Sequence, residues 1–160
     1  MKVEYANPFV QAAVQTFQKE IGVKLSRKDL KIKDSPVPGQ SVSIIIGVTG
    51  AVRGQVVLSM DENVAMAVTK AMLPGKLPVE LKKLVNSAVS ELANIITGQA
   101  SILLAGDHGK IDITPPAIVM GPGLRMDFLN LQTICLSFLS EIGTLELNIA
   151  LTEGQALNAD

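Results

Sequence analysis

Residues 41–60 read SVSIIIGVTGAVRGQVVLSM, and this stretch decides the fold. Two runs rich in β-branched residues, 41–49 and 54–60, flank a short turn that contains glycine, which is typical of a β-hairpin. Asp61 follows at once and is a good N-cap for a helix over about residues 62–73. A hairpin that leads straight into a helix predicts a domain that mixes both kinds of element.

The segment before the hairpin begins with a second helix. Asn7 suits an N-cap, Pro8 suits the first helical position, and Gly22 predicts the end of the helix. Residues 24–33 then carry five cations against the single acidic residue Asp29.

Two interpretations of the segment 24–33 are open. It is either a small anion-binding patch or an edge strand with Leu30 and Ile32 inward and its lysines outward. Outward lysines discourage pairing between sheets, and nucleic-acid sites carry more arginine and aromatic residues than this segment has. The edge strand is therefore the favoured interpretation.

The C-terminal third of the chain predicts more strands, over residues 129–138 and 145–151, with a polar, frayed tail over 153–160. Most of the expected strands are joined by short turns. We therefore expect an α+β fold in which an antiparallel sheet is covered by helices, formed by a single domain over residues 1–160.

Composition excludes several classes of protein. Apolar residues make up 48% of the 160, and the formal net charge of −1 gives no electrostatic case for nucleic acid or a membrane. Cys135 is the only cysteine and His108 the only histidine, so neither an internal disulfide nor a zinc site of the Cys/His type can form. A metal site made only of carboxylates stays possible from composition, but no metal-ligating residues are predicted. We expect a soluble, cytoplasmic protein with an inert, buried thiol at Cys135.

The longest helical pattern covers about residues 78–104 and ends before Gly106. Its apolar residues recur at spacings of three and four: Leu81, Leu84, Val85, Ala88, Val89, Leu92, Ile95 and Ile96. The opposite stripe is polar: Lys83, Ser87, Ser90, Glu91, Asn94 and Thr97. His108 falls in the expected turn after this helix.

Glu91 and Asn94 are the candidate functional pair. They stand three residues apart, so they lie side by side on the helix surface. The spacing Glu-x-x-Asn is weak evidence alone, because it occurs a second time at Glu4 and Asn7, where Asn7 is expected to cap a helix. Gly98 lies one turn beyond Asn94 and would let the backbone of a partner protein approach closely.

The helix sequence resembles the signature helix of the CheC/CheX/FliY chemotaxis phosphatases. In that pattern an acidic residue or serine is followed four positions later by Glu and three later by Asn, which Ser87, Glu91 and Asn94 match. A proline comes some twenty-odd residues on, here Pro115 or Pro116. The start of the chain and the strand 54–60 also fit, and the single usable Glu-x-x-Asn helix points to the CheX type.

The resemblance implies a substrate, a phosphorylated response regulator of the CheY type, which binds its own Mg²⁺. Asn94 would orient the attacking water, and Glu91 would pair with the active-site lysine of the regulator. Ser87, Ser90 and Gly98 would help to form the docking surface. The protein itself would need no cofactor.

The resemblance also implies a homodimer joined through the sheets, and the strands 129–138 and 145–151 are expected to offer an edge for it. Two alternatives stay open. One is a non-catalytic CheC-like domain that docks a response regulator or a flagellar-switch protein. The other is a sensor or scaffold domain in which Glu91 and Asn94 are ordinary surface residues.

Overall fold

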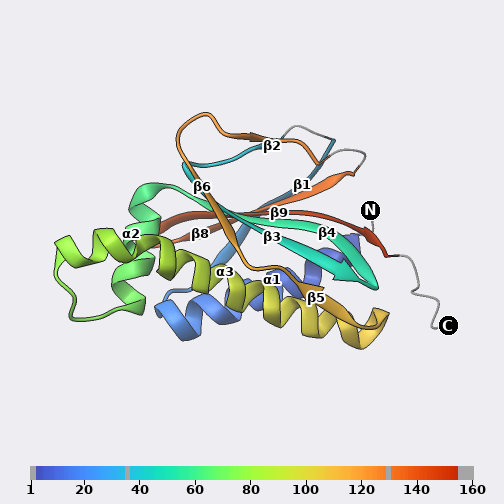
Figure 1. Ribbon diagram of the computed structural model, residues 1–160, viewed down its shortest axis with the longest axis horizontal. Helices are drawn as coiled ribbons and strands as arrows, with labels where there is room; N and C mark the ends of the chain where they lie inside the picture. The colour runs from blue at the N-terminus through green and yellow to red at the C-terminus, as the bar shows by residue number, and fades with distance from the viewer. Residues whose placement is uncertain (1–2, 35–36, 129–130, 155–160) are drawn as a thin grey trace.

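The computed structural model describes residues 3–34, 37–128 and 131–154. Its helices form one layer beneath a strongly curved sheet (Figure 1). Every strand pair among the described residues is antiparallel. The expected α+β fold, with helices over an antiparallel sheet, is therefore confirmed.

Three helices make up the lower layer: α1 (Ala6–Thr16), α2 (Glu62–Met72) and α3 (Pro78–His108). The predicted cap of α2 is confirmed, because the Asp61 carboxylate accepts a hydrogen bond of 2.8 Å from the Val64 N–H. Gly22 is confirmed as a helix stop. It has a left-handed backbone with φ 76°, and its N–H donates to the Phe17 carbonyl after a π-helical turn over Phe17–Ile21.

Two predicted helix ends were wrong. A 3₁₀ turn over Val3–Tyr5 leads directly into α1, so Asn7 lies inside the first turn and does not cap it. The long helix continues through Gly106 to His108 and stops at Gly109, with φ 115°. His108 is therefore helical, and its ring packs edge-on against the ring of Tyr5, 5.3 Å between centroids, which ties the last turn to the start of the chain.

The predicted hairpin is confirmed as β3 (Val42–Gly50) and β4 (Val52–Met60), which pair along their length. The other strands of the main sheet are β1 (Ser26–Lys33), β5 (Ile111–Ile113), β6 (Ala117–Met120), β8 (Thr133–Ser140) and β9 (Gly143–Glu153). Their order is β1-β8-β9-β4-β3-β5, with β6 also on β3. A separate pair, β2 (Val37–Pro38) with β7 (Arg125–Met126), lies above the sheet (Figure 1).

The last two long strands lie in the interior of the sheet. β8 is flanked by β1 and β9, and β9 by β8 and β4, so neither has the free edge that was expected of them. The predicted start of β8 at Leu129 falls outside the described residues. The tail begins later than predicted, because Glu153 still pairs with Val52 and the Gly154 N–H donates to the Ala51 carbonyl; residues 155–160 are not described.

β1 is confirmed as an edge strand. Its register slips between Arg27 and Asp29, so a bulge interrupts its pairing with β8. Leu30 packs against the core, but Ile32 was predicted to point inward and is 49% exposed, because the strand extends past the helices at that end.

The core fills the space between the helices and one face of the sheet. Phe9, Phe17, Leu92 and Ile96 from the helices pack with sheet residues such as Ile149. A smaller cluster on the opposite face covers part of the sheet with Met126 and Phe128. At Gly54, with φ 145°, a Cβ would overlap the Ala150 carbonyl oxygen on β9, so only glycine fits this crossing.

Candidate functional site

Glu91 and Asn94 lie on the outer side of α3. Leu92, Ala93 and Ile96 beside them are at most 1% exposed, because they pack into the core. This packing sets the rotation of the helix, so that Glu91 is exposed and Asn94 is half-buried on the side away from the core. The two side chains are neighbours one turn apart, as the spacing predicted.

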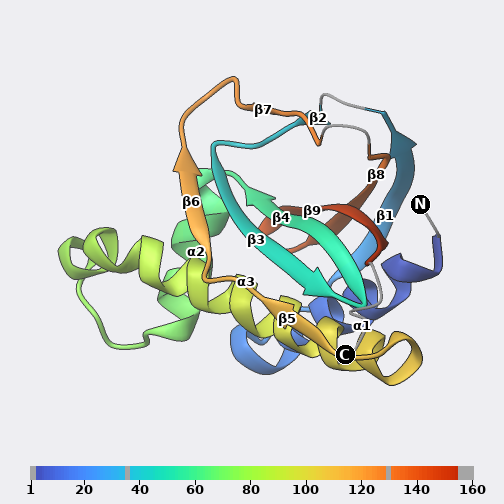
Figure 2. The ribbon, with the colours of Figure 1, turned by 45° about the vertical axis from the view of Figure 1, so that its right-hand side comes forward.

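An open hollow joins the helix pair to the edge of the sheet. Glu91, Asn94 and Ile95 line one side, and the other side is lined by Ile113, Thr114, Pro115 and Pro116. Residues 114–116 connect β5 to β6. β5 runs along α3, β6 then rises away from the helix, and both strands pair with β3 (Figure 2). Both candidate prolines therefore lie at the same hollow as Glu91 and Asn94.

Residues 114–116 interrupt the edge strand because proline has no N–H to give to a sheet. The interruption is held by Thr114. Its Oγ1 accepts a hydrogen bond of 2.8 Å from the Gly47 N–H, and its own N–H donates to the Gly47 carbonyl at 2.9 Å. A Cβ at Gly47 would come within 3.0 Å of the Thr114 methyl group, so the pair also fits closely. The wall of the hollow opposite Asn94 is thereby fixed to β3.

The side chains of Glu91 and Asn94 have no hydrogen bond or ion pair with any other described residue. A carboxylate and a carboxamide thus face an open hollow with their polar atoms unused by the fold. Together they offer acceptors for a cation and both a donor and an acceptor for a water molecule.

The other predicted partner-binding residues lie on α3 but do not line the hollow. Ser87 is exposed, whereas Ser90 and Gly98 are half-buried. A Cβ at Gly98 would have no atom within 4 Å, which is consistent with an open surface there. Thr97 was predicted on the polar stripe, but it is 2% exposed, because the stripe turns gradually toward the core along so long a helix.

Sequence reasoning missed three lining residues: Ile95, which was assigned to the core, and Ile113 and Thr114, which were assigned no role. The last two reach the hollow only through the pairing of β5 with β3. No local pattern in the sequence signals that pairing.

No group of three or more His, Cys, Asp or Glu side chains within residues 3–34, 37–128 and 131–154 is placed to hold a metal ion. Cys135 is half-buried rather than fully buried as expected. Burial raises the pKa of its thiol, which keeps it protonated and a poor nucleophile.

α3 has the length and hydropathy of a membrane-spanning helix, which is weak evidence taken alone. Half of its most apolar window is buried in the fold, and the helix packs against α1 and α2. That pattern is typical of the core helix of a globular domain.

Comparison with known proteins identifies the family of the chain. The sequence profile described as chemotaxis phosphatase CheX matches residues 42–139, which include the hairpin, α3 and the proline interruption. The chain belongs to the CheX family.

Among CheX proteins, the CheY-P phosphatase CheX of Thermotoga maritima is 28% identical over 127 residues, which cover 79% of this chain and 81% of the relative. The crystal structure of a CheX from Desulfovibrio desulfuricans is 24% identical, covers 94% of this chain and 99% of its own, and has a TM-score of 0.83, which supports the fold.

A third relative is a CheX–CheY–BeF₃–Mg²⁺ complex from Borrelia burgdorferi. It is 26% identical, covers 95% of this chain and 100% of the other, and has a TM-score of 0.74. The resemblance to the CheX type inferred from Ser87, Glu91 and Asn94 is thus confirmed at the level of the family.

Proposed function

We propose that the protein is a phosphatase that hydrolyses the aspartyl phosphate of a CheY-type response regulator. The observation that carries this proposal is the unpartnered pair Glu91 and Asn94, side by side at an open hollow. The CheX relatives described above, one named a CheY-P phosphatase and one crystallised with CheY, support the choice of substrate.

Asn94 would place the attacking water. Hydrolysis of an acyl phosphate needs a water in line with the breaking P–O bond, and the reaction depends on positioning more than on covalent chemistry. A carboxamide can accept a hydrogen bond from this water and donate one to it without adding negative charge beside the phosphate. Asn94 is half-buried on a helix fixed by core packing, which restricts its motion and suits this role.

Glu91 would dock the regulator. Its exposed carboxylate is free to form a charge-assisted hydrogen bond with the lysine beside the phosphoaspartate. That bond would set the position of Asn94, one turn further along α3, relative to the phosphorus atom. Ser87, Ser90 and Gly98 on the same helix would contact the regulator around this bond. The Mg²⁺ of the reaction would belong to the regulator, so the phosphatase would need no cofactor of its own.

We further propose that the protein works in the cytoplasm, where its regulator resides, as a soluble homodimer. Its composition and the packing of α3 as a core helix support a soluble protein. Neither nucleic acid nor a membrane is needed for this activity.

The direct test mixes the purified protein with an acyl-phosphorylated CheY protein and Mg²⁺, and follows the loss of phosphate. We expect phosphate loss faster than the regulator's own rate, with turnover at substoichiometric amounts of the phosphatase. Complex formation without acceleration would instead establish the binding-only alternative, and the absence of both would leave the scaffold interpretation.

A further inference from the structure

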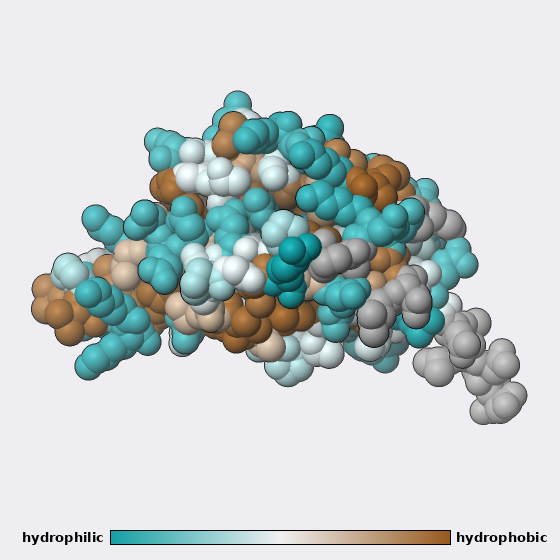
Figure 3. Space-filling view, turned by 90° about the horizontal axis from the view of Figure 1, so that it is seen from above, coloured by the Kyte–Doolittle hydropathy of each residue, from teal (hydrophilic) through white to brown (hydrophobic). Residues whose placement is uncertain are grey.

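A second hollow lies on the face of the sheet away from the helices. It is bounded by β1, β8 and β9 and walled on one side by Val37 and Pro38 of β2. Seen from that side, the molecule presents mostly hydrophilic groups (Figure 3). The hollow is separate from the one at Glu91 and Asn94, and the proposed phosphatase reaction makes no use of it.

The strand register brings the polar side chains of this hollow together. Lys31 lies opposite Cys135, and Cys135 lies opposite Asn148, so the three form one row across β1, β8 and β9. The next row consists of Asp29, Ser137 and Glu146. Residues opposite one another in a sheet project to the same face, which places both rows in the hollow.

Asn148 is the observation that points to a ligand. Its side chain is 2% exposed, yet its amide nitrogen has no hydrogen-bond partner among the described residues. A buried donor without an acceptor is unfavourable for folding, so such groups normally have a partner. Since Asn148 lines the hollow, an acceptor atom of a bound molecule can supply it.

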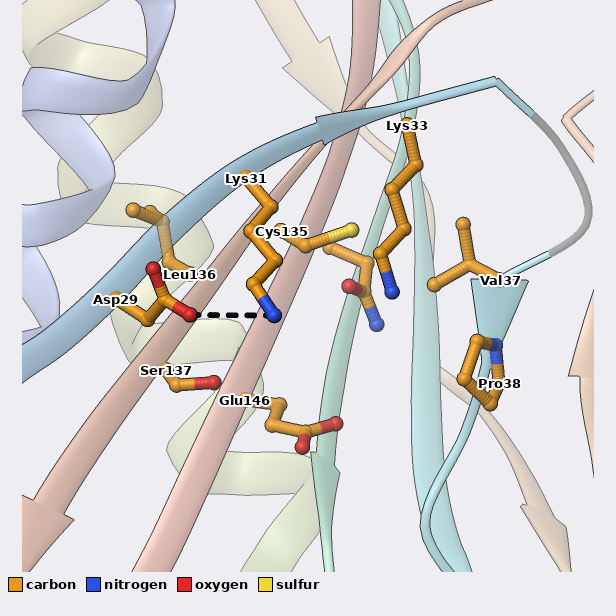
Figure 4. Close-up of a pocket in the computed structure, with 10 residues that line it drawn as sticks. Asp29, Lys31, Lys33, Val37, Pro38, Cys135, Leu136, Ser137 and Glu146 are labelled. Atoms are coloured by element: carbon orange, nitrogen blue, oxygen red, sulfur yellow. Dashed lines mark ion pairs between the residues drawn. The ribbon is translucent and has the colours of Figure 1, made fainter.

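Of the four charged side chains around Asn148, two form an ion pair with each other and two have no ion-pair partner among the described residues. The Lys31 ammonium lies 3.4 Å from the Asp29 carboxylate and is neutralised by it. Lys33 and Glu146 have no ion pair with any described residue, and both side chains extend into the hollow from different sides (Figure 4). One free cation and one free anion therefore face the same space.

These groups define the chemistry of a ligand. Lys33 and the Asn148 amide both donate, which suits a carboxylate, and Glu146 accepts, which suits an ammonium group. A simple anion would bring a second negative charge near Glu146, whereas a zwitterion leaves the charge of the hollow balanced. The volume of about 150 Å³ is below that of sites for drug-sized ligands, so only a small molecule fits.

We propose that this hollow binds a small zwitterionic amino acid, with its carboxylate on Lys33 and Asn148 and its ammonium group on Glu146. Cys135 gives a built-in reporter, because it lines the hollow and is the only cysteine of the chain. A bound molecule must shield its sulfur from alkylating reagents.

The test measures the rate at which iodoacetamide alkylates Cys135 at a mildly alkaline pH, at which glycine is still zwitterionic. Burial raises the pKa of this thiol, so the reaction is slow enough to follow. We expect saturating glycine or alanine to slow it at least tenfold. Acetate, methylammonium and inorganic phosphate should each have less than a twofold effect. Thermal unfolding should shift upward with glycine in parallel.

Variants localise the effect. K33Q and N148L should abolish protection by glycine, while K28Q, a matched loss of an exposed lysine on β1 outside the hollow, should retain it. E146Q should make acetate as protective as glycine, because this substitution removes the repulsion between the Glu146 carboxylate and the acetate anion. Circular dichroism confirms that each variant is folded.

Three results would overturn the proposal: no protection by any amino acid, equal protection in K33Q, or protection of the unaltered protein by acetate or phosphate as strong as by glycine. The last result would mark an unspecific anion site. None of these readouts depends on phosphatase activity, so failure here and failure of the proposed function are distinguishable.

Discussion

At the scale of single residues, the proposed chemistry depends on the difference between a carboxamide and a carboxylate. We expect Asn94→Ala to lower kcat about a hundredfold, the lower end for a positioned catalytic group, because the water is no longer oriented. Asn94→Asp keeps the size of the side chain but adds charge beside the phosphate, so it should be at least as damaging. Stopped-flow measurement of CheY phosphate loss gives kcat and KM. Unchanged kcat in Asn94→Ala would refute the mechanism.

Glu91 should affect binding more than turnover. Replacing Glu91 with glutamine keeps the shape and removes the charge, so the bond to the lysine of the regulator loses its ionic part. We expect KM to rise about tenfold with a smaller change in kcat. Glu141→Gln, which neutralises an exposed carboxylate in the turn between β8 and β9, is the matched control and should leave KM unchanged. Equal effects of both variants would show only a general influence of charge.

At the scale of elements, Gly98 is expected to lower the stability of α3 while it allows the regulator to approach the helix closely. A Cβ fits there without contact, so Gly98→Ala should stabilise α3 by about 1 kcal/mol and raise Tm by about 2–4 °C. If the regulator packs closely on this turn, KM should rise as well. Gly106→Ala, also helical and without contacts, should raise Tm equally but leave KM alone. Calorimetry and the phosphatase assay separate the two effects.

Thr114 connects the proline wall to the sheet. Thr114→Val keeps the volume but removes the acceptor for the Gly47 N–H, so the segment 114–116 should move more freely. Because this bond is exposed, water can replace it and stability should hardly change. We expect kcat to fall several-fold at nearly constant Tm. Thr49→Val, the same substitution at an exposed position of β3 two residues from Gly47, should have no effect.

Local signals in the sequence predicted the helices and strands well, but they predicted poorly which segments pack or pair with one another. The Asp61 cap, the Gly22 stop and the face of α3 that carries Glu91 depend on residues within a turn or two, and all were found. Asn7 was misassigned as a cap because packing of Tyr5 and Phe9 draws the residues before it into a helical turn. The hollow opposite Asn94 depends on Thr114 pairing with Gly47, a contact between distant segments that periodicity does not encode.

At the scale of the whole molecule, a chain with one histidine, one cysteine and few aromatic rings excludes most familiar kinds of active site. The proposed reaction explains why such a composition is sufficient, because the phosphatase and its partner each supply different groups. The metal ion and the covalent phosphate belong to the partner, and this chain supplies a rigid helix with one acid and one amide. The large core behind α3 is what makes that helix rigid.

Self-association also depends on the whole molecule, because the expected homodimer needs a free edge of the sheet. β8 and β9 cannot pair with a second chain because both are interior. Among the described strands the edge at β5 and β6 is broken by Pro115 and Pro116, so β1 offers the longer free edge. Its half-exposed Ile32 lies on that edge and would be covered by a partner.

We expect light scattering at micromolar concentration to give twice the monomer mass of 16.9 kDa, and Ile32→Lys to shift it toward the monomer, since a buried ammonium there would oppose contact between the two strands. Ile102→Lys, at a position that is 74% exposed on α3, controls for the added charge and should remain dimeric. A monomer mass for the unaltered protein would refute the dimer. Dissociation by Ile102→Lys but not by Ile32→Lys would place the interface on the helical layer, where it would compete with the docking of the regulator.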